Sequence, residues 1–258
     1  MTTRSQHLFA RPIRAAAAAL AACMVAACGG GGGGGQGGAA TPVVTVPQPT
    51  VATVAAGTWV VMGSSTAAGA GASAGNGWAN LLQTAMAPHG AQVANIALGG
   101  TVTYEGLSAA APAVANRPKP NPAINIDQAL SRKPVLLIVS YPTNDTALGY
   151  SVDEAVNNIL AIRAQALAAG VPVVVTSTQP RNLSGAQLAQ LQAIDQRLVA
   201  SVGACLVQLN AALAGTDGKP ATQYDAGDGV HPNDAGHRVI VMKVQQLLDG
   251  GACVRFAT

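Results

Sequence analysis

The chain has 258 residues, of which 49% are hydrophobic, 3% aromatic and 10% charged, and its formal net charge is +3. Three of the 14 basic residues are Arg4, Arg11 and Arg14, and without them 11 basic residues balance 11 acidic ones. The basic excess therefore belongs to the start of the chain and gives no indication of nucleic-acid binding. Aromatic side chains on which bases could stack are scarce.

Residues 1–27 have the pattern of an export signal. Arginines precede an apolar run at 15–27 that is too short to span a bilayer as a stable helix. The run ends in small residues followed by Cys28, which resembles the bacterial lipobox, whose cysteine is lipidated. We expect a lipoprotein signal peptide, lipidation of Cys28, and attachment to the periplasmic or cell-surface face of an envelope membrane, with the outer membrane favoured. The alternative is an ordinary signal peptide that happens to contain this cysteine.

Residues 28–56 have the composition of a tether. Residues 29–38 are almost all glycine, and residues 41–54 alternate Thr and Val with interspersed prolines. Because neither segment can bury a core, we expect a flexible coil followed by an extended spacer. The sequence thus predicts one folded domain over 57–258, joined to the membrane only through its N-terminal lipid.

The folded part alternates apolar strand-like runs with segments of helical periodicity. Strands are expected at 58–62, 92–98, 134–140, 171–176 and 204–209. Helices are expected at 78–86, 152–169, 184–201 and 233–248. Strands that are apolar on both faces and alternate with helices are typical of a parallel sheet covered on both sides. We therefore predict a three-layer α/β/α sandwich with a mostly parallel, flavodoxin-like sheet of about five strands.

The last two cysteines are expected to form a disulfide. Cys23 leaves with the signal and Cys28 carries lipid, so Cys205 and Cys253 remain as an even pair in an oxidising compartment. This bond would tie the last strand to the C-terminal tail, and the chain-entropy model values it at about 4 kcal/mol. Two buried thiols are the alternative.

Glycine-rich and polar segments follow the predicted strands. Ligands of open α/β sheets bind beyond the carboxyl ends of the strands, so these segments are expected to meet at one edge. The segments are Gly63-Ser64-Ser65, Leu98-Gly99-Gly100, Thr143-Asn144-Asp145 and, before the last helix, Asp228-Gly229-Val230-His231.

Together these segments contain the groups that acyl transfer needs. A serine hydroxyl is a poor nucleophile until a base takes its proton, and His231 can act as that base for Ser65. Asp228, three residues earlier, can hold the other ring nitrogen and fix the tautomer. The backbone N–H groups of Ser65 and Gly100 and the side-chain amide of Asn144 are the predicted oxyanion donors.

In this order the segments resemble the SGNH hydrolases, also called GDSL-type esterases, over the whole folded part. The family's Gly-Asp-Ser, oxyanion glycine, Gly-x-Asn-Asp and Asp-x-x-His blocks are matched by 63–65, Gly100, 142–145 and 228–231. The resemblance implies a serine esterase that cleaves a small-molecule or polymer-borne acyl ester through an acyl-enzyme intermediate. It implies no cofactor and no metal, and we expect a monomer.

Two positions depart from the family pattern. Ser64 stands where the family has Asp, which leaves both Ser64 and Ser65 as candidate nucleophiles. Pro142 stands where the family has Gly and stiffens the loop before Asn144. If these departures weaken catalysis, the alternative is a surface-binding lipoprotein that uses this fold. The resemblance also leaves open an acyltransferase, because the family includes such enzymes.

Two other kinds of site are weaker readings of the same sequence. Residues 69–74 fit the glycine spacing of a dinucleotide-binding loop, but no helix follows directly and no acidic residue lies about 20 residues further on. Asp228, His231, Asp234 and His237 recur every three residues, as metal ligands can, but Pro232 interrupts a continuous helix there.

Overall fold

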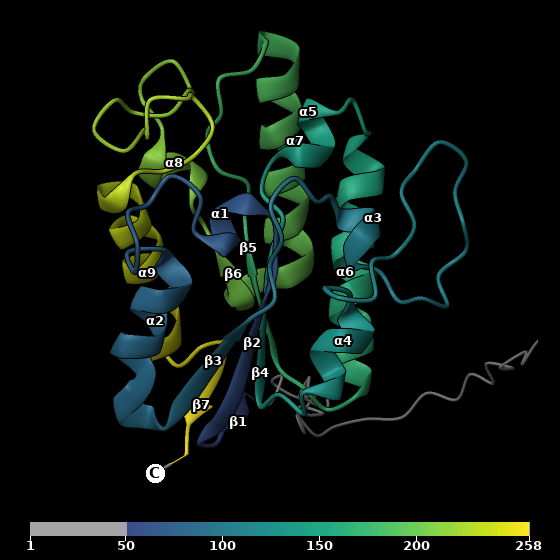
Figure 1. The fold of residues 1–258 in the computed structure, drawn as a ribbon, viewed down its shortest axis with the longest axis vertical. Coiled ribbons are helices and arrows are strands. Elements are labelled where there is room, and N and C mark those ends of the chain that lie inside the picture. Colours follow the sequence, from purple (N-terminus) through teal and green to yellow (C-terminus); the bar gives the residue numbers. More distant parts are fainter. Residues whose placement is uncertain (1–50, 258) are drawn as a thin grey trace, which may run out of the picture. The chain divides into compact units, whose positions relative to one another are not determined.

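A computed structural model describes residues 51–257 of the chain. Its main sheet has five parallel strands in the order β3-β2-β4-β5-β6 (Figure 1). These strands are β2 (Gly57–Gly63), β3 (Ala91–Asn95), β4 (Leu136–Ser140), β5 (Val173–Thr176) and β6 (Leu206–Val207). The predicted parallel five-stranded sheet and its flavodoxin-like order are confirmed. The strand order reverses between β2 and β4, where ligands of such sheets bind.

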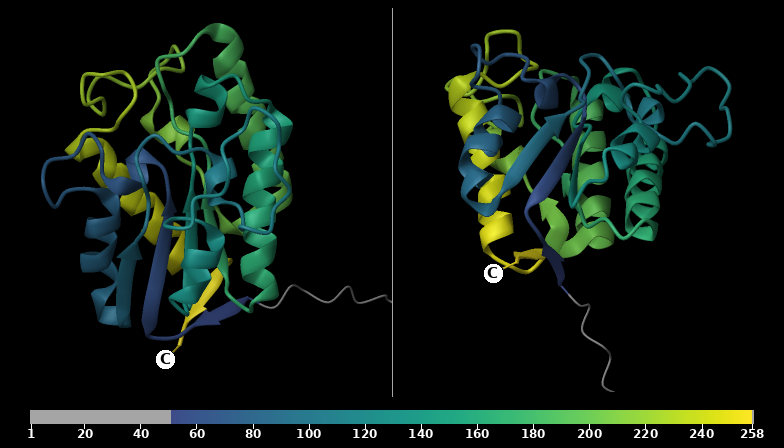
Figure 2. Two further views of the ribbon diagram at one scale, coloured as in Figure 1. Left: turned by 45° about the vertical axis from the view of Figure 1, so that its right-hand side comes forward. Right: turned by 60° about the horizontal axis from the view of Figure 1, so that its bottom comes forward.

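Helices cover both faces of this sheet, which confirms the three-layer architecture (Figure 2). The longer helices begin and end within about one residue of the predicted positions. The helices are α1 (Ser65–Ala68), α2 (Trp78–Met86), α3 (Thr103–Gly106), α4 (Ile126–Ser131), α5 (Asn144–Ala147), α6 (Val152–Ala168), α7 (Gly185–Val202), α8 (Asn210–Leu213) and α9 (Asp234–Asp249). Two 3-10 turns, η1 (Ala87–His89) and η2 (Gly203–Cys205), complete the set.

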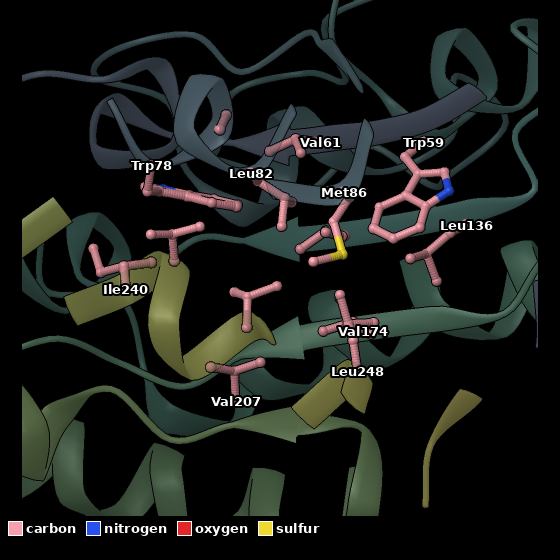
Figure 3. Packing of buried hydrophobic residues seen from close by; sticks show 14 of the residues in the cluster. Trp59, Val61, Trp78, Leu82, Met86, Leu136, Val174, Val207, Ile240 and Leu248 are labelled. Atoms are coloured by element: carbon pink, nitrogen blue, oxygen red, sulfur yellow. The ribbon is translucent and has the colours of Figure 1, made fainter. Parts of the chain in front are cut away.

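Strand β2 shows how one apolar sequence supplies two cores. Successive side chains of a strand point to opposite faces. Trp59 and Val61 enter the cluster beneath α2 and α9, whereas Val60 and Met62 enter the cluster beneath α4, α6 and α7. In Figure 3, Trp59 and Val61 lie with side chains from α2, β4, β5 and α9. The strands are thus packed between two layers of helices, and this packing fixes the carboxyl ends of the strands, where the polar segments lie.

Side-chain caps begin the long helices where the sequence indicates. The hydroxyls of Ser151 and Ser184 accept hydrogen bonds from the third backbone N–H of α6 and α7, in capping boxes with Glu154 and Gln187. Asn233 accepts from two N–H groups at the start of α9, at 2.9 and 3.1 Å. This last cap lies two residues after His231, so the start of α9 limits where the histidine side chain can lie.

A second, two-stranded sheet was not predicted. Strand β1 (Ala52–Val54) pairs in parallel with β7 (Val254–Phe256). Strand β1 falls inside the predicted tether, so the folded part includes residues before 57 and that boundary was wrong. Alternating Val and Thr suits a strand as well as an extended spacer, and only the distant partner β7 decides between them.

The expected disulfide is present between Cys205 and Cys253 and joins the η2–β6 corner to the segment just before β7. The chain-entropy model values a loop of 48 residues at about 4 kcal/mol. The expected signal peptide, Cys28 and the spacer up to residue 50 lie outside the described residues. Within residues 51–257, helices that combine the length and the apolar character needed to cross a bilayer are absent.

Candidate active site

Ser65 is the first residue of α1, directly beyond the carboxyl end of β2. Gly63 allows this turn to lie against the end of β4, because a Cβ at that position would sit 2.0 Å from the carbonyl oxygen of Ser140. The N–H of Ser64 donates to that same carbonyl oxygen at 3.0 Å. The chain leaving β2 is therefore held at the point where the strand order reverses.

The predicted nucleophile, base and acid lie in hydrogen-bond contact. The Oγ of Ser65 is 2.9 Å from Nε2 of His231, and Nδ1 of His231 is 2.6 Å from Oδ2 of Asp228. Ser64 is buried, with 2% of its surface exposed, and in the described residues the serine that contacts His231 is Ser65.

Hydrogen bonds keep the Asp228 carboxyl ionised. Partial burial acts to raise its pKa, but the backbone and side chain of His231 and the N–H of Val230 together lower the pKa to about 2. When His231 is neutral, an ionised Asp228 favours the tautomer with the proton on Nδ1, which leaves the lone pair of Nε2 facing Ser65. This is the protonation pattern that general-base catalysis requires.

The turn that carries His231 is fixed by hydrogen bonds from its own residues and from the loop after β5. Asp225 accepts from the N–H groups of Gly227 and Gly229, each at 3.0 Å. The side-chain amide of Gln179 donates to the carbonyl oxygen of Val230 at 2.9 Å. The histidine is thus positioned by backbone contacts that spacing along the sequence alone does not reveal.

The loop between α1 and α2 also lies against this turn. Gly71 is so close that a Cβ there would meet the carbonyl oxygen of Pro232 at 2.3 Å and the Cβ of His231 at 2.8 Å. Its φ of 88° is a second reason for glycine. The segment considered as a dinucleotide-binding loop therefore packs against His231.

The segment that contains Gly100 packs against Ser65 through Gly99, and Asn144 is hydrogen-bonded to the same segment. The N–H of Leu98 and the hydroxyl of Thr101 donate to the carbonyl oxygen of Gly63, at 3.1 and 3.3 Å. Between them, Gly99 lies against Ser65, and Gly100 has a φ of 82° with open space where a side chain would be. The Nδ2 of Asn144 donates to the carbonyl oxygen of Thr101 at 2.9 Å, which joins the second and third segments.

Two neighbouring residues, Arg181 and Asp145, were not predicted to have a role in the site, although Asp145 lies in one of the matched blocks. Arg181 donates from Nη1 to Oδ1 of Asn144 at 3.0 Å and to Oγ1 of Thr143 at 3.3 Å. It lies beyond the end of β5, so the strand-end rule applied to that strand would have found it. Asp145 is buried and accepts from the N–H and hydroxyl of Thr103, at 3.1 and 2.5 Å. Burial raises the pKa of Asp145, and these bonds oppose that shift.

The four residues considered as metal ligands separate into different roles. Asp234 accepts two hydrogen bonds from Ser73, both at 2.7 Å. His237 is fully buried, with Nδ1 accepting from the N–H of Trp78 at 3.1 Å and Nε2 lying 3.0 Å from the carbonyl oxygen of Ala70. In the part of the chain that the structure describes, His, Cys, Asp and Glu side chains form no group of three suited to a metal.

A model of the GDSL-like lipase/acylhydrolase family matches residues 61–239 of this chain. No curated protein matches it. Among solved structures, TesA is similar with a TM-score of 0.60 at 22% identity, over 75% of this chain and 99% of that chain.

Two further solved structures share the fold. The psychrotrophic esterase EstA from Pseudoalteromonas sp. gives a TM-score of 0.56 at 18% identity, over 73% of this chain and 94% of its own. The acetyl xylan esterase AlAXEase gives 0.55 at 16% identity, over 73% and 98%. These likenesses extend across nearly the whole of each solved chain.

Proposed function

This chain belongs to the GDSL-like lipase/acylhydrolase family, and on that basis we propose that it is a serine esterase acting through an acyl-enzyme on Ser65. The observation that carries the proposal is the chain of contacts from Ser65 through His231 to Asp228, at 2.9 and 2.6 Å. A hydroxyl, an imidazole and an ionised carboxylate in this order are what acyl transfer to serine requires.

In the proposed mechanism His231 takes the proton of Ser65 as the Oγ attacks the carbonyl carbon of the ester. The oxyanion that forms accepts hydrogen bonds from the N–H groups of Ser65 and Gly100 and from the amide of Asn144. His231 then gives its proton to the leaving alcohol, and a water activated by the same imidazole releases the acid. Asp228 stays ionised throughout and holds the ring.

The first experiment compares Ser65→Ala with Ser64→Ala in the purified full chain. We expect Ser65→Ala to lower kcat for p-nitrophenyl acetate by about 10⁴-fold or more, since it removes the nucleophile. The matched change at Ser64 should keep most of the activity.

Other outcomes assign the protein differently. Activity that survives in Ser65→Ala and is lost in Ser64→Ala would move the nucleophile by one residue. A wild-type chain that neither hydrolyses the ester nor reacts with a fluorophosphonate would favour a binding protein without catalysis. Ester consumption that rises with an added alcohol and yields a new ester would indicate an acyltransferase.

For localisation, we propose export and lipid anchoring at Cys28 in the cell envelope. The support is the apolar run at 15–27 and the small residues before the cysteine. Cells expressing the full chain would be grown with an alkyne-tagged palmitate, and we expect label on the wild type and none on Cys28→Ser. Equal labelling of both chains, or secretion of an unlabelled wild type, would contradict the proposal.

A further inference from the structure

The side-chain amide of Asn144 is held at both ends. Its Nδ2 donates to the carbonyl oxygen of Thr101 at 2.9 Å, and its Oδ1 accepts from Nη1 of Arg181 at 3.0 Å. The same Nη1 lies 3.3 Å from the hydroxyl of Thr143, at the N-cap of α5. Within residues 51–257 the second hydrogen on Nδ2 has no protein acceptor and is free for a substrate oxygen.

These two partners determine which end of the amide faces which way. The oxygen and nitrogen of an asparagine amide have nearly the same shape, so their hydrogen-bond partners decide the orientation. A carbonyl oxygen can only accept and a guanidinium can only donate. If the amide were flipped, Oδ1 would face the oxygen of Thr101 and Nδ2 would face Arg181, and both contacts would be repulsive.

The charge of Arg181 also makes the side-chain amide of Asn144 a stronger hydrogen-bond donor. A hydrogen bond from a guanidinium to a neutral carbonyl is stronger than one between neutral groups. Hydrogen bonds in series polarise one another, so the bond at Oδ1 makes the N–H groups of Asn144 better donors. Arg181 is partly buried, which limits screening of its charge by water and salt.

Asp228 is the charged group that faces Arg181. Burial lowers the pKa of Arg181, and the negative charge of Asp228 opposes this shift. A guanidinium stays protonated in proteins at neutral pH, so the positive charge is present during catalysis. Arg181 thus interacts with the acid of the proposed triad as well as with Asn144.

Resting on the proposed esterase function, we propose that Arg181 is a positioning residue that holds Asn144 in the orientation that donates to the oxyanion and strengthens that donation. Because the oxyanion exists only after attack, loss of Arg181 should lower kcat and leave KM nearly unchanged. If Arg181 only anchored the loop, its loss would lower the free energy of unfolding without lowering kcat selectively over KM.

The test is a double-mutant cycle in the full chain with p-nitrophenyl acetate. We expect Asn144→Ala to lower kcat by about 10²–10³-fold, as loss of an oxyanion donor does. Arg181→Ala should lower kcat by about 10-fold or more in the wild type and by less than about 2-fold in the Asn144→Ala background. Millimolar guanidinium should restore part of the kcat of Arg181→Ala and none in the double variant.

Arg197→Ala is the matched control, because Arg197 is an exposed arginine of α7 that pairs with Asp153. It should keep the wild-type kcat. Urea unfolding of each variant, with Arg181→Met as a second substitution of similar length without donors, separates a folding defect from a catalytic one.

Two results would overturn the proposal while leaving the esterase in place. In the first, Arg181→Ala lowers kcat by the same factor in the wild-type and the Asn144→Ala backgrounds. In the second, Arg181→Ala has the same kcat as Arg197→Ala. A wild type without ester hydrolysis, indistinguishable from Ser65→Ala, is a different result, because it contradicts the proposed function itself and this inference with it.

Discussion

At the residue scale, two carboxylates show how burial and hydrogen bonds together set the charge of an acid. Asp228 has hydrogen bonds from Val230 N–H, His231 N–H and the imidazole of His231, and its pKa is lowered to about 2 against the effect of burial. Asp195 has two, from the N–H and hydroxyl of Thr178, and burial raises its pKa to about 6. Asp228, which is more exposed and has one more donor, thus stays ionised, whereas the more buried Asp195 has a pKa of about 6.

The raised pKa of Asp195 predicts a pH-dependent stability. The folded state binds the proton more tightly than the unfolded chain, whose carboxyl has a pKa near 3.8. Its contribution is therefore complete below about pH 3.8 and is lost as the pH rises through about 6. Relative to Asp195→Asn, we expect the wild type to lose up to about 3 kcal/mol of unfolding free energy over this window.

Urea unfolding of both chains at several pH values between 4 and 8 measures this difference. Asparagine is a suitable control because its amide can donate to the hydroxyl oxygen of Thr178 while Oδ1 accepts from the N–H. A difference that does not change with pH would mean that the carboxyl titrates at its ordinary value in the folded protein.

At the element scale, the loop between α1 and α2 matters through one glycine. A side chain on Gly71 would overlap Pro232 and His231, whereas one on Gly75, whose φ of 83° is nearly the same as 88° at Gly71, would meet nothing within 4 Å. An L-residue in the left-handed region costs about 1 kcal/mol at either position. Only at Gly71 would the side chain also clash with neighbouring atoms.

We expect Gly71→Ala to lower kcat/KM by about 10-fold or more, because a displacement of His231 of about 1 Å is enough to spoil its alignment with Ser65. Gly75→Ala should keep nearly wild-type kinetics and lose only the shared backbone cost in urea unfolding. Equal kinetic losses in the two variants would show that contact between this loop and the histidine turn does not control alignment.

The elements that the sequence predicted are those that carry their own signals. Strand β4 is a run of apolar residues, and α6 has a serine cap, acidic residues in its first turn and apolar periodicity. Strands β1 and β7 have three residues each and exist as a pair, and α3 starts beside Asp145 of α5. Such short elements depend on partners far away in the sequence, which local propensity cannot supply.

At the scale of the whole molecule, the sequence predicts those parts of the site that the sheet topology alone brings together. The expected meeting of Ser65, Asp228 and His231 follows from the rule that strand ends share an edge. The contact of Arg181 with Asn144 depends on the side-chain geometry of two separate loops, and a single arginine after a strand is normally a surface residue. Sequence reasoning therefore found the proposed triad and oxyanion donors and missed Arg181, which contacts one of those donors.

The β1–β7 pair determines where this domain can be attached to a support without covering Ser65. Strand β1 and strand β7 lie together at one end of the sandwich, and α1, which begins at Ser65, lies at the other (Figures 1 and 2). A bead, a fusion partner or a lipid joined through either end of the domain would therefore leave the mouth of the site unobstructed.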